Sequence, residues 1–81
     1  MELVELTEYL VKSVAKEKDA VSVKLFDDTD DTLMIQVLVD PTDMGSVIGK
    51  GGKIASSIRT IVQASSYLKD NKLVRISIDS F

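Results

Sequence analysis

An 81-residue chain that is 44% hydrophobic and 28% charged fits one ordinary globular domain, residues 1–81, whose apolar runs are too short to cross a bilayer. It contains neither Cys nor His, which excludes disulfides, the usual zinc ligands and the Ser-His and Cys-His pairs of nucleophilic enzymes, so we expect no catalytic residue, metal or cofactor. The net charge of −3 argues against a generic polyanion binder.

The first element in the chain is an expected amphipathic helix. Leu3, Leu6, Leu10 and Val14 recur at spacings of three and four, which predicts a helix over roughly residues 2–17. No basic and apolar leader precedes it, so a cytoplasmic protein is expected.

Two strands follow. Apolar residues alternate with polar ones over 21–25 and recur at every second position over 33–39, and these two strands most simply form a hairpin. The acidic cluster Asp27–Asp31 between them is interpreted as a solvated turn. A calcium loop is excluded there, because Leu33 stands where such a loop needs its sixth-position glycine.

The second half of the chain predicts two helices and a last strand. Asp40–Asp43 ends the preceding strand and caps a short helix over 44–48. A longer helix is expected from about Gly52 to Ser66, with an apolar stripe on one side and Arg59 and Gln63 opposite it. A polar loop and a strand over 74–78 complete an α-β-β-α-α-β order, which favours an α+β two-layer sandwich.

The two later helices meet at Gly49-Lys50-Gly51-Gly52, which we call the glycine loop. Glycines permit positive φ and a close approach to a ligand, and the amides at the start of the next helix attract anions. Residues 44–69 contain four basic and no acidic residues, so this segment carries +4 and the remaining residues carry −7. The pattern predicts a phosphate-backbone site, with a plain helix–helix turn as the alternative.

The sequence does not match two common nucleotide-binding motifs. A Walker loop needs four residues between its glycines and Ser or Thr after the lysine, whereas three residues separate Gly45 from Gly49, and Gly51 follows Lys50. The dinucleotide pattern fails because Ile54 occupies its last glycine position.

The stretch Val47–Ala55, followed by Ile58-Arg59-Thr60, resembles the core of the KH domain. The element order is similar to the prokaryotic, type II KH arrangement, a three-stranded mixed sheet packed against three helices, and the resemblance spans most of the chain. Within that fold the chain looks most like the small bacterial single-KH proteins of the KhpA family.

The resemblance implies a function. KH domains clamp single-stranded RNA at their G-x-x-G loop, so this chain would be an RNA-binding, RNA chaperone-like post-transcriptional regulator with no membrane and no small-molecule substrate. KhpA-like proteins pair with themselves and with a larger KH protein, KhpB (Jag or EloR), in cell elongation and cell-wall homeostasis. The implied RNA-binding residues are Val47, Ile48, Gly49, Lys50, Gly51, Gly52, Lys53, Ile54 and, more peripherally, Arg59 and residues 67–71.

Two alternatives stay open. A KH fold could serve as a protein-interaction module with little RNA binding, or the chain could be a small enzyme or nucleotide-binding domain. The apolar stripe of the long helix, which includes Ile54, Ile58, Ile61, Val62, Ala64 and Leu68, is broad for packing on one small sheet, so it is either all core or partly shared with a partner. The expected dimer interface comprises Ile58, Ile61, Val62 and Ser65.

Overall fold

A computed structural model describes residues 2–81; for Asp27 and Asp28 it describes the backbone alone, so the predicted solvation of their side chains lies outside the described part, as does Met1. The α-β-β-α-α-β order is confirmed, with three additional one-turn 3-10 helices, η1 to η3. The elements are α1 (Leu3–Lys12), η1 (Lys18–Ala20), β1 (Ser22–Asp28), β2 (Thr32–Val39), η2 (Pro41–Asp43), α2 (Met44–Ile48), η3 (Lys50–Gly52), α3 (Lys53–Lys69) and β3 (Leu73–Ser80).

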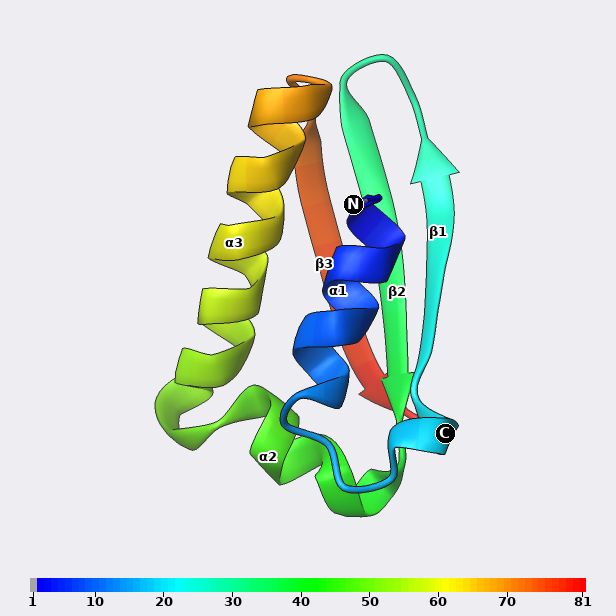
Figure 1. Ribbon diagram of the computed structural model, residues 1–81, viewed down its shortest axis with the longest axis vertical. Helices are drawn as coiled ribbons and strands as arrows, with labels where there is room; N and C mark the ends of the chain where they lie inside the picture. The colour runs from blue at the N-terminus through cyan, green and yellow to red at the C-terminus, as the bar shows by residue number, and fades with distance from the viewer. Residues whose placement is uncertain (1) are drawn as a thin grey trace.

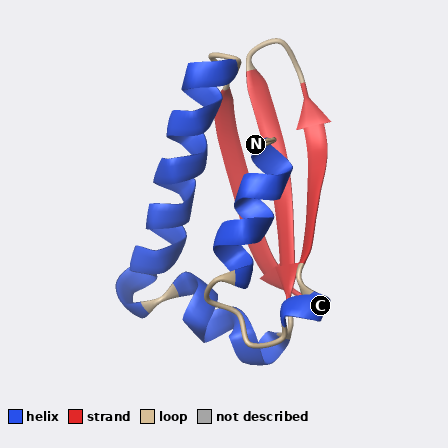
Figure 2. Ribbon diagram, viewed as in Figure 1, coloured by secondary structure: helices blue, strands red, loops and turns tan. Residues whose placement is uncertain are grey.

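The sheet is mixed, as predicted. Its strand order is β1-β2-β3, with β1 antiparallel and β3 parallel to the central strand β2. Figures 1 and 2 show α1 and α3 side by side on one face of this sheet, with α2 at the end where β2 terminates. The fold is therefore the expected two-layer α+β sandwich of the type II KH arrangement.

The core lies between the sheet and the two long helices. Along β2 every second side chain is buried, from Leu33 to Val39, because a strand places alternate residues on opposite faces. Val11 of α1 and Ile58 and Val62 of α3 pack into the same cluster. Burying these side chains is what holds α3, and the loop that precedes it, at a fixed position on the sheet.

The predicted first helix is too long at its C-terminal end. The helix stops at Lys12, and Val14 and Ala15 reach the core from non-helical backbone. The cause lies in the distant Asp43, whose buried carboxylate accepts hydrogen bonds from the backbone amides of Lys16 (3.0 Å) and Glu17 (2.9 Å). These contacts fasten the segment after α1 to the turn that leads into α2.

Candidate nucleic-acid interface

The glycine loop folds back on itself through left-handed backbone. Gly49, Gly51 and Gly52 have φ values of 79°, 64° and 76°, a region that other residues enter only with strain. Gly49 combines this φ with a ψ of 168°, which is accessible essentially to glycine alone. This sharp turn lets α3 begin at Lys53, with only four residues between it and the end of α2 at Ile48.

The three glycines differ in what surrounds them. A β-carbon added to Gly49 would clash with Cγ1 of Ile54 and lie 2.9 Å from the backbone nitrogen of that residue, so the chain packs on itself there. A β-carbon added to Gly51 or Gly52 would meet nothing within 4 Å. Gly49 is thus required by packing, whereas Gly51 and Gly52 face open space.

Some amides of the loop are occupied and others are free. Gly49 N–H donates to the Gly45 carbonyl at 2.9 Å, and Gly52 N–H donates to the Gly49 carbonyl at 3.1 Å. Within the described residues the amides of Lys50 and Gly51 donate to no protein acceptor. No side chain caps α3, whose N-terminus begins at Lys53, so the positive end of the helix dipole adds to this donor pair.

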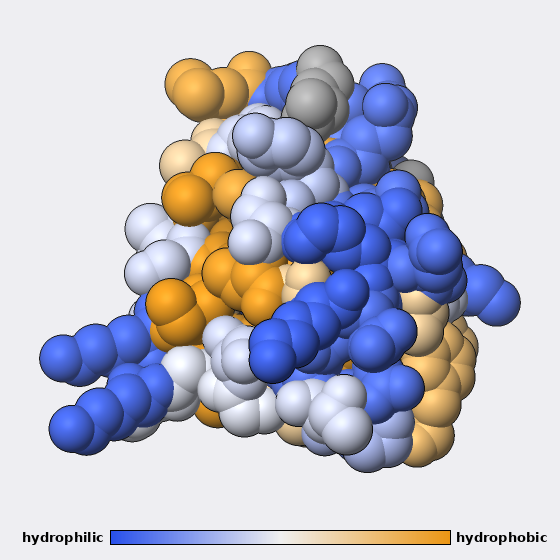
Figure 3. Space-filling view, turned by 60° about the horizontal axis from the view of Figure 1, so that its bottom comes forward, coloured by the Kyte–Doolittle hydropathy of each residue, from blue (hydrophilic) through white to orange (hydrophobic). Residues whose placement is uncertain are grey.

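Two lysines border the free amides. Lys50 and Lys53 are exposed, and neither takes part in an ion pair with any residue that the structure describes. In the view toward the α2 end, hydrophilic surface projects on the side where α2 leads into α3, next to an apolar patch (Figure 3). The loop therefore presents unpaired donors and unpaired positive charge together.

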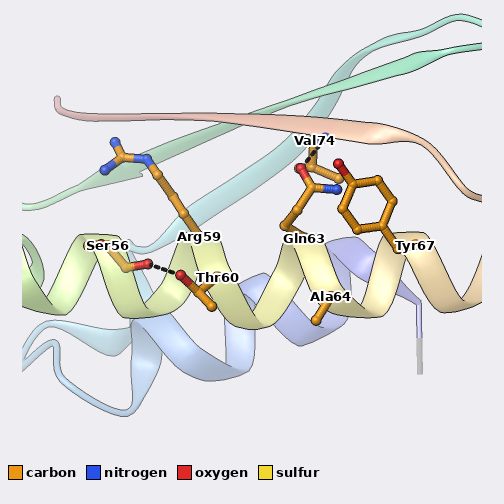
Figure 4. Close-up of a pocket in the computed structure, with 7 residues that line it drawn as sticks. All are labelled: Ser56, Arg59, Thr60, Gln63, Ala64, Tyr67 and Val74. Carbon is orange, nitrogen blue, oxygen red and sulfur yellow. Dashed lines mark hydrogen bonds between the residues drawn. The ribbon is translucent and has the colours of Figure 1, made fainter.

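A groove runs along α3 beside the edge strand β3. It has a volume of about 480 Å³, and its walls are the α3 side chains Ser56, Arg59, Thr60, Gln63, Ala64 and Tyr67, and Val74 of β3. Figure 4 shows Arg59, Gln63 and Tyr67 extending from the helix toward β3. We call this the α3/β3 groove.

Arg59 and Gln63, which are expected opposite the apolar stripe of the helix, cover the outer edge of β3. The Arg59 guanidinium donates to the Ile76 carbonyl at 3.4 Å. The Gln63 amide donates to the Lys72 carbonyl (2.9 Å) and accepts from Val74 N–H (2.8 Å). Sequence periodicity alone could not find this contact, because it depends on the position of a strand that follows later in the chain.

The apolar residues predicted for RNA binding fall into different environments. Val47 is fully buried in the core, so its side chain cannot touch a ligand. Ile48 is half-buried and Ile54 partly exposed. Only the latter two can offer apolar surface beside the loop.

The expected dimer residues also separate. Ile58 and Val62 belong to the core, which corrects the expectation that they face a partner, and Ser65 is half-buried. Ile61 is 46% exposed. It lies in an exposed stripe that continues through Ser57, Ala64 and Leu68, the last of which is 89% exposed.

The spacing of this stripe could have been read from the sequence. Ile54, Ile61 and Leu68 are seven residues apart, with the small residues Ser57 and Ala64 between them, which is the heptad pattern of a helix that meets another helix. At 3.6 residues per turn, Ile54, Ile61 and Leu68 lie on a different side of α3 from Arg59 and Gln63. We call these five residues the α3 stripe.

Comparison with known proteins identifies related sequences. The family model described as KhpA/KhpB, KH domain, matches residues 4–78. The RNA-binding protein KhpA of Clostridium perfringens is 39% identical over 74 residues, covering 91% of this chain and 96% of that protein. The KhpA protein of Streptococcus pneumoniae serotype 4 is 40% identical over 70 residues, covering 86% of this chain and 85% of that protein.

Solved structures share the fold at low sequence identity. Aquifex aeolicus Era bound to GDP.AlF4- superposes with a TM-score of 0.76 at 13% identity; the match covers 98% of this chain but 30% of Era. Era in complex with MgGDPNP and nucleotides 1506-1542 of 16S ribosomal RNA gives a TM-score of 0.70 at 18% identity, over 96% of this chain and 29% of that one. At these identities the likeness concerns the fold alone.

Proposed function

Because the chain belongs to the KhpA/KhpB KH-domain family, a family of RNA-binding domains and not of enzymes, we propose that it binds single-stranded RNA through the glycine loop. The observation that carries this proposal is a pair of amides, at Lys50 and Gly51, that have no acceptor among residues 2–81 as described; two lysines without a described ion-pair partner border them, and the site is open to solvent. Unpaired main-chain donors at the start of a helix suit phosphate oxygens.

The glycine loop and the α3/β3 groove bind different parts of the RNA. The amides of Lys50 and Gly51 and the ammonium groups of Lys50 and Lys53 hold phosphates, and they supply affinity without sequence preference. Unstacked bases enter the groove, where Tyr67 and Val74 offer apolar surface and Arg59 and Gln63 offer hydrogen-bond donors. A single domain with so few contacts binds weakly.

The test changes the charge of the loop and keeps its shape. Gly51→Asp combined with Gly52→Asp places two carboxylates where there is room for them, and Asp tolerates positive φ better than most residues. Like charge beside a phosphate is strongly unfavourable, so affinity for single-stranded RNA should fall tenfold or more in fluorescence anisotropy. The same variant should abolish RNA crosslinking in cells.

The matched control is Gly51→Asn combined with Gly52→Asn, which has the same shape and the same tolerance of positive φ without charge. It should lose much less affinity than the aspartate pair. Circular dichroism should report an intact fold for both variants. RNA binding that survives the aspartate pair unchanged would favour the rival function, a KH fold used only for protein interaction.

A second role, self-association through the α3 stripe, is favoured by the heptad spacing of its exposed residues. Ser57 and Ala64 are small enough to let a second α3 approach closely, while Ile54, Ile61 and Leu68 supply apolar area. The stripe leaves the α3/β3 groove open apart from Ala64, which borders both. Dimerisation and RNA binding are therefore compatible.

Replacing Ile61 with Asp tests this second role. Ile61 is not in the core, so the variant should stay folded and become monomeric by light scattering while the unaltered chain is dimeric. Thr60→Asp, an exposed neighbour on the groove side, should stay dimeric. A monomeric unaltered chain would overturn the proposal.

One family model describes the KH domains of KhpA and KhpB, so a KhpB-type protein would offer a domain of the same fold, and we propose it as the alternative occupant of the α3 stripe. On that basis we extend the proposal to a cytoplasmic RNA chaperone in cell elongation and cell-wall homeostasis. Loss of co-purification of a KhpB-type protein with the Ile61→Asp variant is the expected result. Within the described residues, no helix combines the length and apolar composition needed to span a bilayer.

A further inference from the structure

The face of the sheet that points away from the helices carries side chains that the proposed function leaves unused. On β2 the outward residues alternate with the buried ones and include Met34 and Gln36. The strand register places Lys24 of β1 opposite Gln36, and Arg75 of β3 opposite Met34. Figure 1 shows both long helices on the other face, so no described element covers this one.

An aromatic ring stands on this face. Phe26 is 73% exposed and sits at an irregularity in the register between Leu25 and Asp27. Bulges of this kind redirect a side chain. Phe26 borders a shallow hollow of about 230 Å³ together with Met34, Gln36 and Ser77.

Two cations flank the ring. Lys24 and Arg75 are exposed on the strands to either side of β2 and form no ion pair with any described residue. Strand spacing and rise place their α-carbons about 12 Å apart. Asp79, an outward-facing acid on β3, is four residues from Arg75, or roughly 13 Å. The register also places Asp27, of which only the backbone is described, opposite Met34. An aromatic ring between two cations that have no ion-pair partner among the described side chains matches the chemistry of a single nucleic-acid strand.

This face is continuous with the α3/β3 groove. A second hollow passes over the edge of β3 and is lined by Arg59, Leu73, Val74, Arg75 and Ile76. Arg59 and Val74 also line the α3/β3 groove, whereas Arg75 lies on the outer face. A strand of RNA held in the groove can therefore cross β3 and reach Phe26.

We propose that the outer face of the sheet is a second nucleotide-binding surface, on which a base of the same RNA strand stacks against Phe26. The amide of Gln36 and the hydroxyl of Ser77 make no hydrogen bond within the described residues and are placed to bind the edge of that base. Lys24 and Arg75 neutralise the flanking phosphates. This inference rests on the proposed RNA binding by the glycine loop.

The test compares two RNA lengths by fluorescence anisotropy, using oligonucleotides of four and of ten nucleotides with mixed sequence. The shorter RNA fills the glycine loop, and the longer one also reaches the outer face. Phe26→Ala should weaken binding of the ten-nucleotide RNA about fivefold or more, the lower end of the contribution of base stacking on an aromatic ring. Binding of the four-nucleotide RNA should not change. Phe26→Tyr, which keeps the ring, should bind the ten-nucleotide RNA with the affinity of the unaltered chain.

Tyr9→Ala is the matched control, because Tyr9 is a similarly exposed aromatic residue on α1, on the helical side of the sheet. It should bind both RNAs like the unaltered chain. Equal losses for both RNAs with Phe26→Ala, or no loss for either, would overturn the inference while leaving loop binding intact. If the unaltered chain binds neither RNA, the proposed function fails and this inference with it. A change of oligomeric mass with unchanged RNA affinity would instead assign the face to protein contact.

Discussion

The two ends of α3 differ in how far the protein itself satisfies their backbone hydrogen-bonding groups. At its N-terminus the helix has no side-chain cap, and the amides of Lys50 and Gly51 donate to no acceptor in the part of the chain that the structure describes. At its C-terminus the Ser66 carbonyl accepts hydrogen bonds from the amides of Asp70 (2.7 Å) and Asn71 (2.9 Å), and Ser66 Oγ donates to the Lys72 carbonyl. The C-terminal end is closed by the protein itself, whereas the N-terminal end is open and keeps two amides without an acceptor among the described residues.

The comparison predicts which substitutions should change the free energy of unfolding and which should change RNA affinity. Changes at the closed end remove hydrogen bonds that the folded chain already makes, so they should lower the free energy of unfolding and leave RNA affinity alone. Changes at the open end remove groups that have no protein partner, so they should do the reverse. Gly49 is the exception, because it lies at the open end but packs on Ile54.

Gly49→Ala should have the largest effect. The added carbon meets the Ile54 side chain and backbone in a conformation that only glycine adopts, so strain and overpacking together should cost about 3 kcal/mol of unfolding free energy. Urea unfolding followed by circular dichroism measures this loss. Gly51→Ala, with no steric neighbour, should lose about 1 kcal/mol through its positive φ alone. Equal losses would contradict the distinction between the two glycines.

Asn71→Ala comes next. Asn71 ends the helix with a φ of 54°, where Asn is tolerated and Ala is strained, so we expect a loss of about 1.5 kcal/mol in urea unfolding. Asn71→Gly should keep the stability of the unaltered chain or exceed it. A drop in RNA affinity with either variant would show that the closed end is also part of the binding site.

Ser66→Ala should cost about 1 kcal/mol, because it removes a buried hydroxyl that donates to Lys72 O at 2.9 Å. The matched substitution in the same helix is Ser57→Ala, whose hydroxyl is exposed and donates to the Lys53 carbonyl within the helix. Thermal unfolding should separate the two. Equal midpoints for both variants would argue against a closed C-terminal end.

Lys50→Ala and Lys53→Ala should have the smallest effect on stability, within about 0.5 kcal/mol, since both side chains are exposed and form no ion pair with a described residue. Both substitutions should mainly lower RNA affinity. If two or three phosphates are neutralised, log affinity should fall against log salt with a slope of about −1.4 to −2.1, and each substitution should reduce the slope by about 0.7. A slope near zero for the unaltered chain would rule out phosphate clamping.

The sequence predicted those features that local periodicity controls. The alternation of apolar residues along β2 and the glycine loop between two helices are local patterns, and both appear in the structure. The sequence does not predict that α1 ends already at Lys12, because the cause is distant: the Asp43 carboxylate accepts hydrogen bonds from backbone amides 26 and 27 residues away. Heptad spacing places Ile54, Ile61 and Leu68 on one side of α3, but it does not say which side of the helix enters the core. The sequence therefore could not distinguish the buried Ile58 from the exposed Ile61, because that depends on how α3 is turned toward the sheet.

The candidate site was predicted in part for the same reason. The loop and its lysines are contiguous in sequence, so a motif reveals them. The α3/β3 groove joins Tyr67 and Gln63 to Val74 across a turn, and the roles of Arg59 and Gln63 depend on which strand lies at the edge of the sheet. Strand order is a tertiary property that no short segment encodes.

The covering of β3 by α3 also bears on solubility. The outward-facing main-chain groups of an edge strand can template pairing with another chain, which is how folded proteins polymerise into continuous sheets. Along β3 the carbonyl groups of Lys72 and Ile76 and the amide of Val74 are already engaged by Gln63 and Arg59. These two side chains therefore hinder the pairing of another strand with that stretch of β3, in addition to lining the groove.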